Sequence, residues 1–239
     1  MDTLRSGHPR PATETEAQAL AHALRESRRA LVQTVHAISA VAARRDHYTA
    51  QHQLRVALLA LAIGEEMRLE AAVLEGLYLG ALVHDIGKIA IPTEVLAKPA
   101  RLTAEEYALV RTHVRVGWEI LEAVSLPWPI QSIIGQHHER LDGTGYPAGL
   151  LGADIVLEAR IVAVADVFQA LCDYRPYRAA LGIAPALAEL EQGAGVTFDG
   201  EVVRALKRLL ARERAPSAAA LWQQLESSRL ASTVVLPVR

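Results

Sequence analysis

Helical spacing of apolar residues is the feature that most constrains how this chain can fold. Leu20, Leu24, Leu31, Val35 and Ile38 follow one another at steps of three, four and seven residues, opposite a charged face, within residues 15–43. Most of the other long segments repeat this spacing, and Gly or Pro residues separate them. The spacing matches the 3.6-residue turn of an amphipathic α-helix and not the alternation of a half-buried strand. The pattern therefore predicts an all-α fold.

Local signals place the remaining helices and one loop. Further helices are expected over residues 48–67, 70–86, 103–123, 156–173, 183–193 and 199–213, after Pro129, and after Pro216. Gly87 is expected to end the 70–86 helix as a left-handed C-cap, with His84 and Asp85 in the last turn. Thr103 and Glu106 form a capping-box pattern at the start of the next helix, which contains His113. Residues 140–154 hold four glycines and a proline, which predicts a shaped loop.

Composition excludes several functional classes. The chain has 239 residues, 51% of them hydrophobic, which is enough for a full core. Because 27 acidic residues balance 25 basic ones, we expect no general binding to nucleic acid polymers. The single cysteine, Cys172, excludes a disulfide framework and a multi-cysteine zinc cluster. The N-terminus lacks the apolar run of a secretory signal, and Glu75 interrupts the most apolar stretch, so we expect a cytoplasmic protein without a membrane partner.

Two short strings concentrate histidine and acid in a way that predicts a metal site. They are His84-Asp85-Ile86-Gly87-Lys88 and the stretch from His137-His138-Glu139 to Gly145-Tyr146-Pro147. Imidazole and carboxylate together suit borderline divalent ions such as iron, manganese, zinc or nickel. Asp85 is the bridging candidate, because a carboxylate can bridge two ions and an imidazole cannot readily do so.

Such a site suits phosphoryl transfer. A bound divalent ion lowers the pKa of water from about 15.7 to about 7, and two ions can hold both the resulting hydroxide and the phosphate oxygens. Lys88, one of three lysines in the chain, can offer a positive charge to the phosphate. Taken alone, His113 is also compatible with an ordinary buried histidine, and Gly87 with a helix cap.

The ordered motifs resemble the HD-GYP family, a group of HD metal-dependent phosphohydrolases that hydrolyse cyclic di-GMP. The resemblance runs over about residues 40–207. It includes the residues from Arg45 to Thr49 with His52, the two strings above, Lys98-Pro99 with Thr103 and Glu106, His113 with Gly117, Asp166, and Arg175-Pro176-Tyr177-Arg178.

The resemblance implies a helical bundle of the HD superfamily with a dinuclear metal site. One ion, expected to be iron or manganese, would be held by His52, His84, Asp85 and Asp166, and the other by Asp85, His113, His137 and His138. Asp166 enters only through the family pattern. Tyr48 stands where some members have a glutamate for a third ion, so two ions are expected. Asp85 and Lys88 would be catalytic, and Lys88, Arg175, Arg178 and Tyr146 would contact the substrate. Gln169 and Tyr174 replace acids common in the family.

The expected function is hydrolysis of cyclic di-GMP to pGpG, GMP or both by a metal-bridged hydroxide. The alternatives are an HD phosphohydrolase acting on another nucleotide or on a cyclic dinucleotide such as cyclic GMP-AMP, and a non-catalytic module that binds cyclic di-GMP or a GGDEF domain. We expect an N-terminal extension with an amphipathic helix over residues 1–40, the HD-GYP domain over 41–213, and a helix with a tail over 214–239. The N-terminal helix could form a homodimer, and a GGDEF-domain protein is a possible partner.

Overall fold

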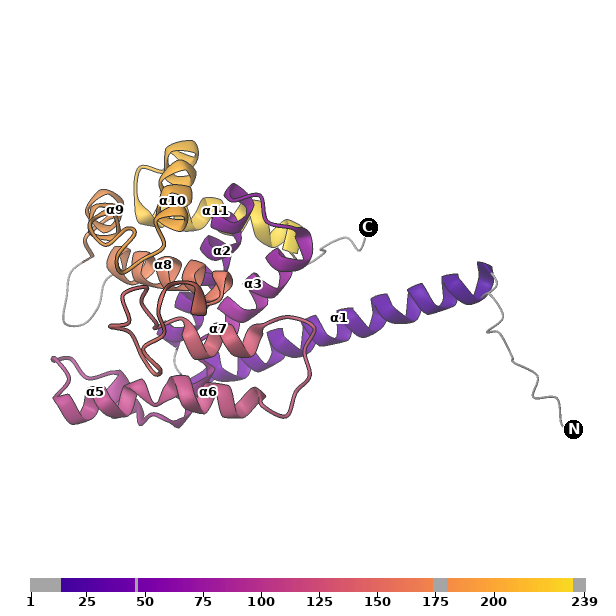
Figure 1. Cartoon of the computed structure of the whole chain (residues 1–239), viewed down its shortest axis with the longest axis horizontal. Helices are drawn as coiled ribbons and strands as arrows, with labels where there is room; N and C mark the ends of the chain where they lie inside the picture. The colour runs from indigo at the N-terminus through magenta and orange to yellow at the C-terminus, as the bar shows by residue number, and fades with distance from the viewer. Residues whose placement is uncertain (1–13, 46, 174–179, 234–239) are drawn as a thin grey trace, which may run out of the picture.

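The computed structural model describes residues 14–45, 47–173 and 180–233. These residues form helices joined by loops, without a β-strand among them, which confirms the all-α prediction (Figure 1). The main helices are α1 (Glu14–Arg45), α2 (His47–Glu66), α3 (Ala71–Val83), α5 (Ala104–Arg111), α6 (His113–Leu121), α7 (Ile130–Gln136), α8 (Leu157–Cys172), α9 (Ile183–Gln192), α10 (Gly200–Glu213) and α11 (Ala218–Thr233). Short helical turns are η1 (Ile86–Ala90), α4 (Thr93–Leu96) and η2 (Gly152–Asp154).

Helix α2 lies at the centre of the molecule. Residues 56–63 are buried on every side, because α1, α3, α8, α10 and α11 all pack against this helix. An apolar sequence without a polar face is what a helix surrounded in this way requires. None of the described helices is long and apolar enough to cross a membrane. The centre of the fold therefore offers several neighbouring helices on which a buried site can be built.

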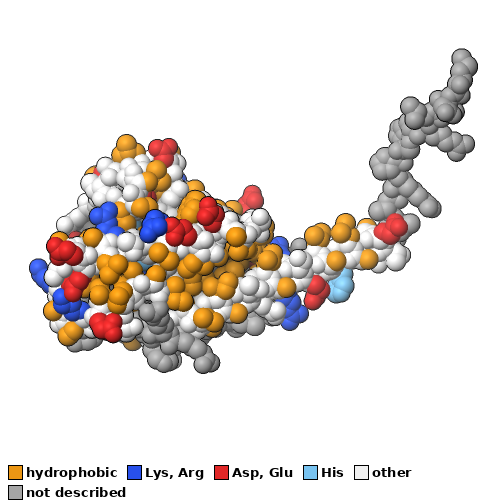
Figure 2. All heavy atoms as spheres, turned by 90° about the horizontal axis from the view of Figure 1, so that it is seen from below, with side chains coloured by type: hydrophobic (Ala, Val, Ile, Leu, Met, Phe, Trp, Pro, Cys, Tyr) orange, Lys and Arg blue, Asp and Glu red, His pale blue; other side chains and the backbone are white. Residues whose placement is uncertain are grey.

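Helix α1 packs on the body with its C-terminal half, while its N-terminal half extends past the body (Figure 1). Arg28 forms an ion pair with the buried carboxylate of Glu75 on α3, which also accepts a hydrogen bond from Trp128 Nε1 at 3.1 Å. Leu20 and Leu24, near the free end, are 63% and 62% exposed. Figure 2 shows hydrophobic side chains continuing along the extended part of α1.

The expectation that Gly87 ends the 70–86 helix as a left-handed C-cap is wrong. Helix α3 ends at Val83, and Gly87 lies within η1 rather than at a left-handed cap, since it is not one of the glycines with positive φ. A β-carbon at Gly87 would overlap the backbone carbonyl of His113 and lie 2.5 Å from the Gly117 nitrogen. Glycine is needed at this position because η1 and α6 touch backbone to backbone, a contact that local sequence does not reveal.

The single helix expected over residues 103–123 is also wrong, because it is divided at Thr112 into α5 and α6. The capping box at its start is confirmed: the Thr103 hydroxyl accepts from Glu106 N at 3.2 Å, and the Glu106 carboxylate accepts from Thr103 N at 2.8 Å. At the division, the Thr112 hydroxyl donates to the Leu109 carbonyl at 2.7 Å, a local bond that competes with continuous helix. As a result, His113 is the first residue of α6.

Candidate metal centre

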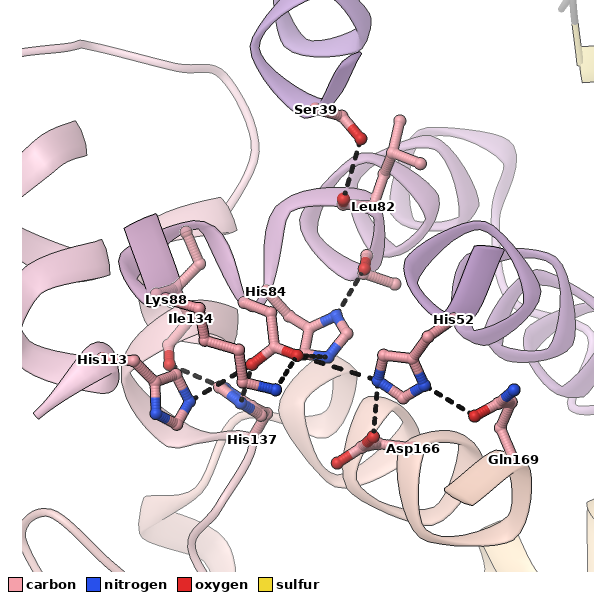
Figure 3. A network of polar contacts seen from close by, with 12 residues as sticks. Ser39, His52, Leu82, His84, Lys88, His113, Ile134, His137, Asp166 and Gln169 are labelled. Carbon is pink, nitrogen blue, oxygen red and sulfur yellow. Dashed lines mark hydrogen bonds and ion pairs between the residues drawn. The ribbon is translucent and has the colours of Figure 1, made fainter. Parts of the chain in front are cut away.

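The seven predicted metal ligands come from five parts of the fold and meet around Asp85. The structure places His52 on α2, Asp166 on α8, and His113 at the start of α6. His84 and Asp85 lie between α3 and η1, and His137 and His138 follow the last residue of α7. Figure 3 shows the side chains of His52, His84, His113, His137 and Asp166 pointing toward one another.

The two carboxylate oxygens of Asp85 face different groups of histidines. Oδ2 lies 3.3 Å from His84 Nε2 and 3.7 Å from His52 Nε2, whereas Oδ1 lies 3.3 Å from His113 Nε2 and 4.0 Å from His137 Nε2. Two overlapping sets have ligand atoms within 4.8 Å of one another: Asp85 with His52 and His84, and Asp85 with His113, His137 and His138. Asp166 Oδ1 adds an oxygen 3.1 Å from His52 Nε2.

Hydrogen bonds orient three of these rings for metal binding. His84, His113 and His137 each place Nδ1 against the main-chain carbonyl three residues earlier, so Nδ1 carries the proton and Nε2 has a free lone pair. The acceptors are the carbonyls of Ala81, Val110 and Ile134, at 2.7, 2.6 and 2.8 Å.

The inner atoms of the site fit a metal ion because protein does not satisfy them. The Nε2 atoms of His84, His113 and His137 and Oδ1 of Asp85 are buried, and no hydrogen-bond partner among the described residues reaches them. A buried polar atom without a partner is costly. Four such atoms converging from separate elements are explained by divalent cations, which nitrogen and oxygen donors of this kind bind well.

The charges in the site favour the forms that bind a metal. Burial and the neighbouring His84 and His113 rings lower the pKa of His137 to about 3, so its imidazole is neutral. Burial alone would raise the pKa of Asp85, but Lys88 and His84 outweigh it and hold that pKa well below the usual range. Burial likewise opposes charge on His84, yet the Asp85 carboxylate raises its pKa. A proton therefore competes with a metal ion more at His84 than at His137.

His138 is held by ring stacking. Its ring lies 4.6 Å from that of Tyr146 with an interplanar angle of 25°, and the Arg111 guanidinium lies 4.3 Å from the centre of the same Tyr146 ring. Both groups therefore pack against the Tyr146 ring. Burial raises the pKa of Tyr146, and its hydroxyl stays protonated. Tyr146 can therefore offer a protonated hydroxyl to a ligand.

Glu139 organises the loop that carries Tyr146, a role that the sequence analysis missed. Its side chain is buried, and its carboxylate accepts from the main-chain nitrogens of Ala148, Gly149 and Leu150 at 2.7, 3.2 and 3.0 Å. The available signal was an acid directly before a glycine-rich loop, whose unpaired N–H groups need an acceptor. The loop also contains a cis Tyr146–Pro147 peptide bond.

The other predicted residues have mixed outcomes. Lys88 Nζ lies 2.5 Å from Asp85 Oδ2 at the edge of the site, with its side chain 24% exposed. Arg175 and Arg178 lie outside the described residues, as does the side chain of Tyr48, so the structure does not address these predictions. Gln169, noted in the sequence only as a departure from the family, hydrogen-bonds to His52 Nδ1 at 2.6 Å.

Comparison with known proteins agrees with this geometry. The HD domain family model matches residues 35–202. A cyclic di-GMP phosphodiesterase response regulator of Xanthomonas campestris is 43% identical over 166 residues, covering 69% of this chain and 44% of the relative. A 3'3'-cGAMP-specific phosphodiesterase of Vibrio cholerae is 40% identical over 163 residues, covering 68% and 35%. This chain thus spans less than half the length of either relative.

A solved structure has the same arrangement of helices. An HDG"Y"P protein from Bdellovibrio bacteriovorus superimposes with a TM-score of 0.57 at 25% identity, over 67% of this chain and 51% of that one. The family match covers well over half of the chain and includes all seven predicted ligands. The chain therefore belongs to the HD domain family and, by its motifs and relatives, to the HD-GYP group within it.

Proposed function

We propose that this protein is a metal-dependent phosphodiesterase that opens cyclic di-GMP to pGpG and continues, in part or fully, to GMP. The observation that carries the proposal is the position of the Asp85 carboxylate, because its two oxygens face two separate groups of imidazoles. One carboxylate can in this way serve two cations, which is the arrangement that phosphoryl transfer uses. Relatives named as cyclic di-GMP phosphodiesterases support the choice of substrate.

The proposed cofactor is a pair of divalent ions, with iron or manganese as the first candidates. His52, His84, Asp85 and Asp166 would hold one ion, and Asp85, His113, His137 and His138 the other. When bound, the ions supply Lewis acidity toward a water molecule and toward the phosphate oxygens. The donor set of nitrogen and oxygen atoms without sulfur suits these metals.

The protein's own residues position and neutralise the substrate. Lys88 places a positive charge at the rim of the site, where it can meet the phosphate as charge develops on it. Tyr146 offers a protonated hydroxyl, and the loop that carries it is held by hydrogen bonds to the Glu139 carboxylate. Arg175 and Arg178 remain predicted phosphate contacts, since guanidinium groups suit phosphate oxygens.

The proposal is tested by assaying the protein purified without oxygen and loaded with iron or manganese. We expect two metal ions per chain and conversion of cyclic di-GMP to pGpG or GMP. Chromatography of the nucleotides monitors the conversion. Asp85→Asn should lose metal and activity together, because it weakens a ligand of both ions. Asp154→Asn, an exposed acid outside the site, is the matched control. Two bound ions without turnover of any cyclic dinucleotide would favour a non-catalytic binding module instead.

A second candidate substrate is 3'3'-cGAMP. Two relatives from Vibrio cholerae named for this substrate are 40% and 43% identical to the chain, similar to the relatives named for cyclic di-GMP. The metal centre acts on the phosphodiester and does not distinguish the bases. The two substrates should therefore be compared at equal enzyme concentration, and the ratio of their kcat/KM values assigns the specificity.

We further propose a homodimer through α1, supported by the exposed apolar side chains of Leu20 and Leu24. Leu20→Asp together with Leu24→Asp should then convert a dimer to a monomer in light scattering after gel filtration. An unchanged mass would contradict it. A GGDEF-domain partner and a cytoplasmic location also remain proposals, the latter supported by a single buried cysteine that fits a reducing compartment.

A further inference from the structure

Gln169 links the metal ligand His52 to a second group of polar residues. It lies on α8, three residues after Asp166, and is fully buried. Its amide oxygen is 2.6 Å from His52 Nδ1, and its amide nitrogen is 2.5 Å from Asp173 Oδ2. Figure 3 shows Gln169 beside His52, at the ring nitrogen that does not face Asp166.

The chemistry of the partners determines which atom of the Gln169 amide donates a hydrogen bond and which accepts one. An ionised carboxylate such as that of Asp173 can only accept hydrogen bonds, so the amide NH₂ of Gln169 must face it. The amide oxygen then faces His52, whose Nδ1 must carry the proton. His52 Nε2 then faces Asp166 and Asp85, from which it lies 3.1 and 3.7 Å away.

Asp173 is itself held by residues from two other helices. Arg55 Nη1, on α2, donates to Asp173 Oδ2 at 2.9 Å. Trp222 Nε1, on α11, donates to Asp173 Oδ1 at 3.3 Å, and the Arg55 guanidinium lies 5.8 Å from the centre of the Trp222 ring. The chain of hydrogen bonds therefore runs from the metal site through α8 to the C-terminal helix.

His52 is oriented differently from the other histidines. Within the described part of the chain, His84, His113 and His137 use main-chain carbonyls three residues earlier in the sequence. The partner of His52 is a side chain 117 residues away in sequence. Its tautomer consequently depends on the packing of α2 against α8 and on the identity of residue 169.

We propose that Gln169 is a positioning residue for the metal ion held by His52, and that Asp173, Arg55 and Trp222 fix the orientation of its amide. The inference rests on the proposed two-metal site. Removing a group that orients a metal-binding histidine costs about 10–100-fold in metal affinity. Since these hydrogen bonds orient only His52, the loss of affinity should fall on the one ion that His52 holds.

The main test compares Gln169→Leu with the wild type. Metal-free full-length protein is titrated with Mn²⁺ by calorimetry, and nitrogen NMR of the histidine rings reports the His52 tautomer. We expect Gln169→Leu to weaken one of two binding events by about 10–100-fold and to convert His52 from its Nδ1–H form to a mixture. Gln223→Leu at an exposed position on α11 makes the same chemical change outside the hydrogen-bond network of Gln169, so this variant should match the wild type.

Two further variants separate positioning from general damage. Gln169→Glu brings a second carboxylate against Asp173, so it should also weaken the site. Trp222→Phe keeps an aromatic ring but removes the N–H, and a smaller loss in the same direction is expected.

The outcomes distinguish this inference from the proposed function. If the wild type binds no Mn²⁺, the two-metal proposal fails, whereas the tautomer measurement still decides the role of Gln169. If the wild type binds two ions and Gln169→Leu binds both with unchanged affinity and an unchanged His52 tautomer, the positioning role is overturned. Equal weakening of both ions would also overturn it.

Discussion

Replacing Gly87 with alanine should separate the two halves of the metal centre. A β-carbon at this position would overlap the carbonyl of His113 and lie 2.5 Å from Gly117 N, whereas ordinary contacts begin at 3.4 Å. Both obstacles are main-chain atoms of α6, so no side chain can rotate away to make room. The turn η1 must therefore move from α6 by roughly 1 Å, a distance at which misplaced catalytic groups can lose about 10²-fold in rate.

The cost to stability follows from the same collision. Inserting a methyl group into a tightly packed region costs typically about 1–3 kcal/mol, and we expect the upper end because backbone must shift. For a domain of this size, about 3 kcal/mol corresponds to a fall in Tm of roughly 6–12 °C. The movement also carries Asp85, two residues before Gly87, away from His113, so the ion between them should be lost first.

Calorimetry with and without Mn²⁺, combined with metal analysis, measures both effects. Gly200→Ala, at the start of a helix, is the matched control, because its β-carbon would lie 3.3 Å from the flexible end of Arg204 and at an ordinary contact distance of 3.6 Å from Gly195 N. It should leave Tm unchanged or slightly raised. A Gly87→Ala protein with the Tm and the metal content of the wild type would refute the backbone contact between η1 and α6.

Three other predictions address single groups. Lys88→Ala should keep both ions with little change in Tm. Its kcat should fall by about 10²–10³-fold, which is the usual effect of losing one donor to the charge that develops in the transition state. Loss of metal in this variant would contradict the role assigned to Lys88. Glu139→Ala leaves three loop N–H groups without their acceptor and should cost about 1–3 kcal/mol, and it should expose the 143–149 loop to limited proteolysis; resistance equal to the wild type would argue against the anchoring role. The pKa of His137 is lowered from 6.5 to about 3, so the unfolded state binds the proton first. EDTA-treated protein should therefore lose stability as pH falls from 6.5 toward 3, by about 1.4 kcal/mol per pH unit for this group. His84, whose pKa is raised, changes stability only above pH 6.5 and does not offset this loss. Thermal unfolding across this range should show a shallower slope for His137→Gln, and an identical slope would contradict the assignment.

Local sequence signals predicted much of the fold because they act within one turn of helix. The capping box of Thr103 and Glu106 is present as expected, and the helices from α8 to α10 begin and end within about two residues of the predicted positions. The errors arose where another element intervenes. Gly87 looked like a helix cap, but its small size is required by α6, which lies beside it only in the folded chain.

The candidate site shows the same division between local and distant information. The strings around His84 and His137 indicated metal from residue types alone, and the family resemblance added His52, His113 and Asp166. Neither source assigned a role to Glu139 or to the hydrogen bond between Gln169 and His52. These partners are identified by position in space, and a glutamate or glutamine in a helical sequence carries no local mark of what it will meet.

The sequence by itself determined the helical class of the fold, the nitrogen and oxygen donors available to a metal, and the order in which they occur along the chain. Only the tertiary structure decided that one oxygen of Asp85 faces His84 while the other faces His113, and that both rings turn Nε2 inward while Nδ1 faces a main-chain carbonyl. The physical reason is that helical periodicity acts between residues three or four positions apart. The geometry around Asp85 depends instead on helices far apart in sequence, which meet only when the hydrophobic core has packed.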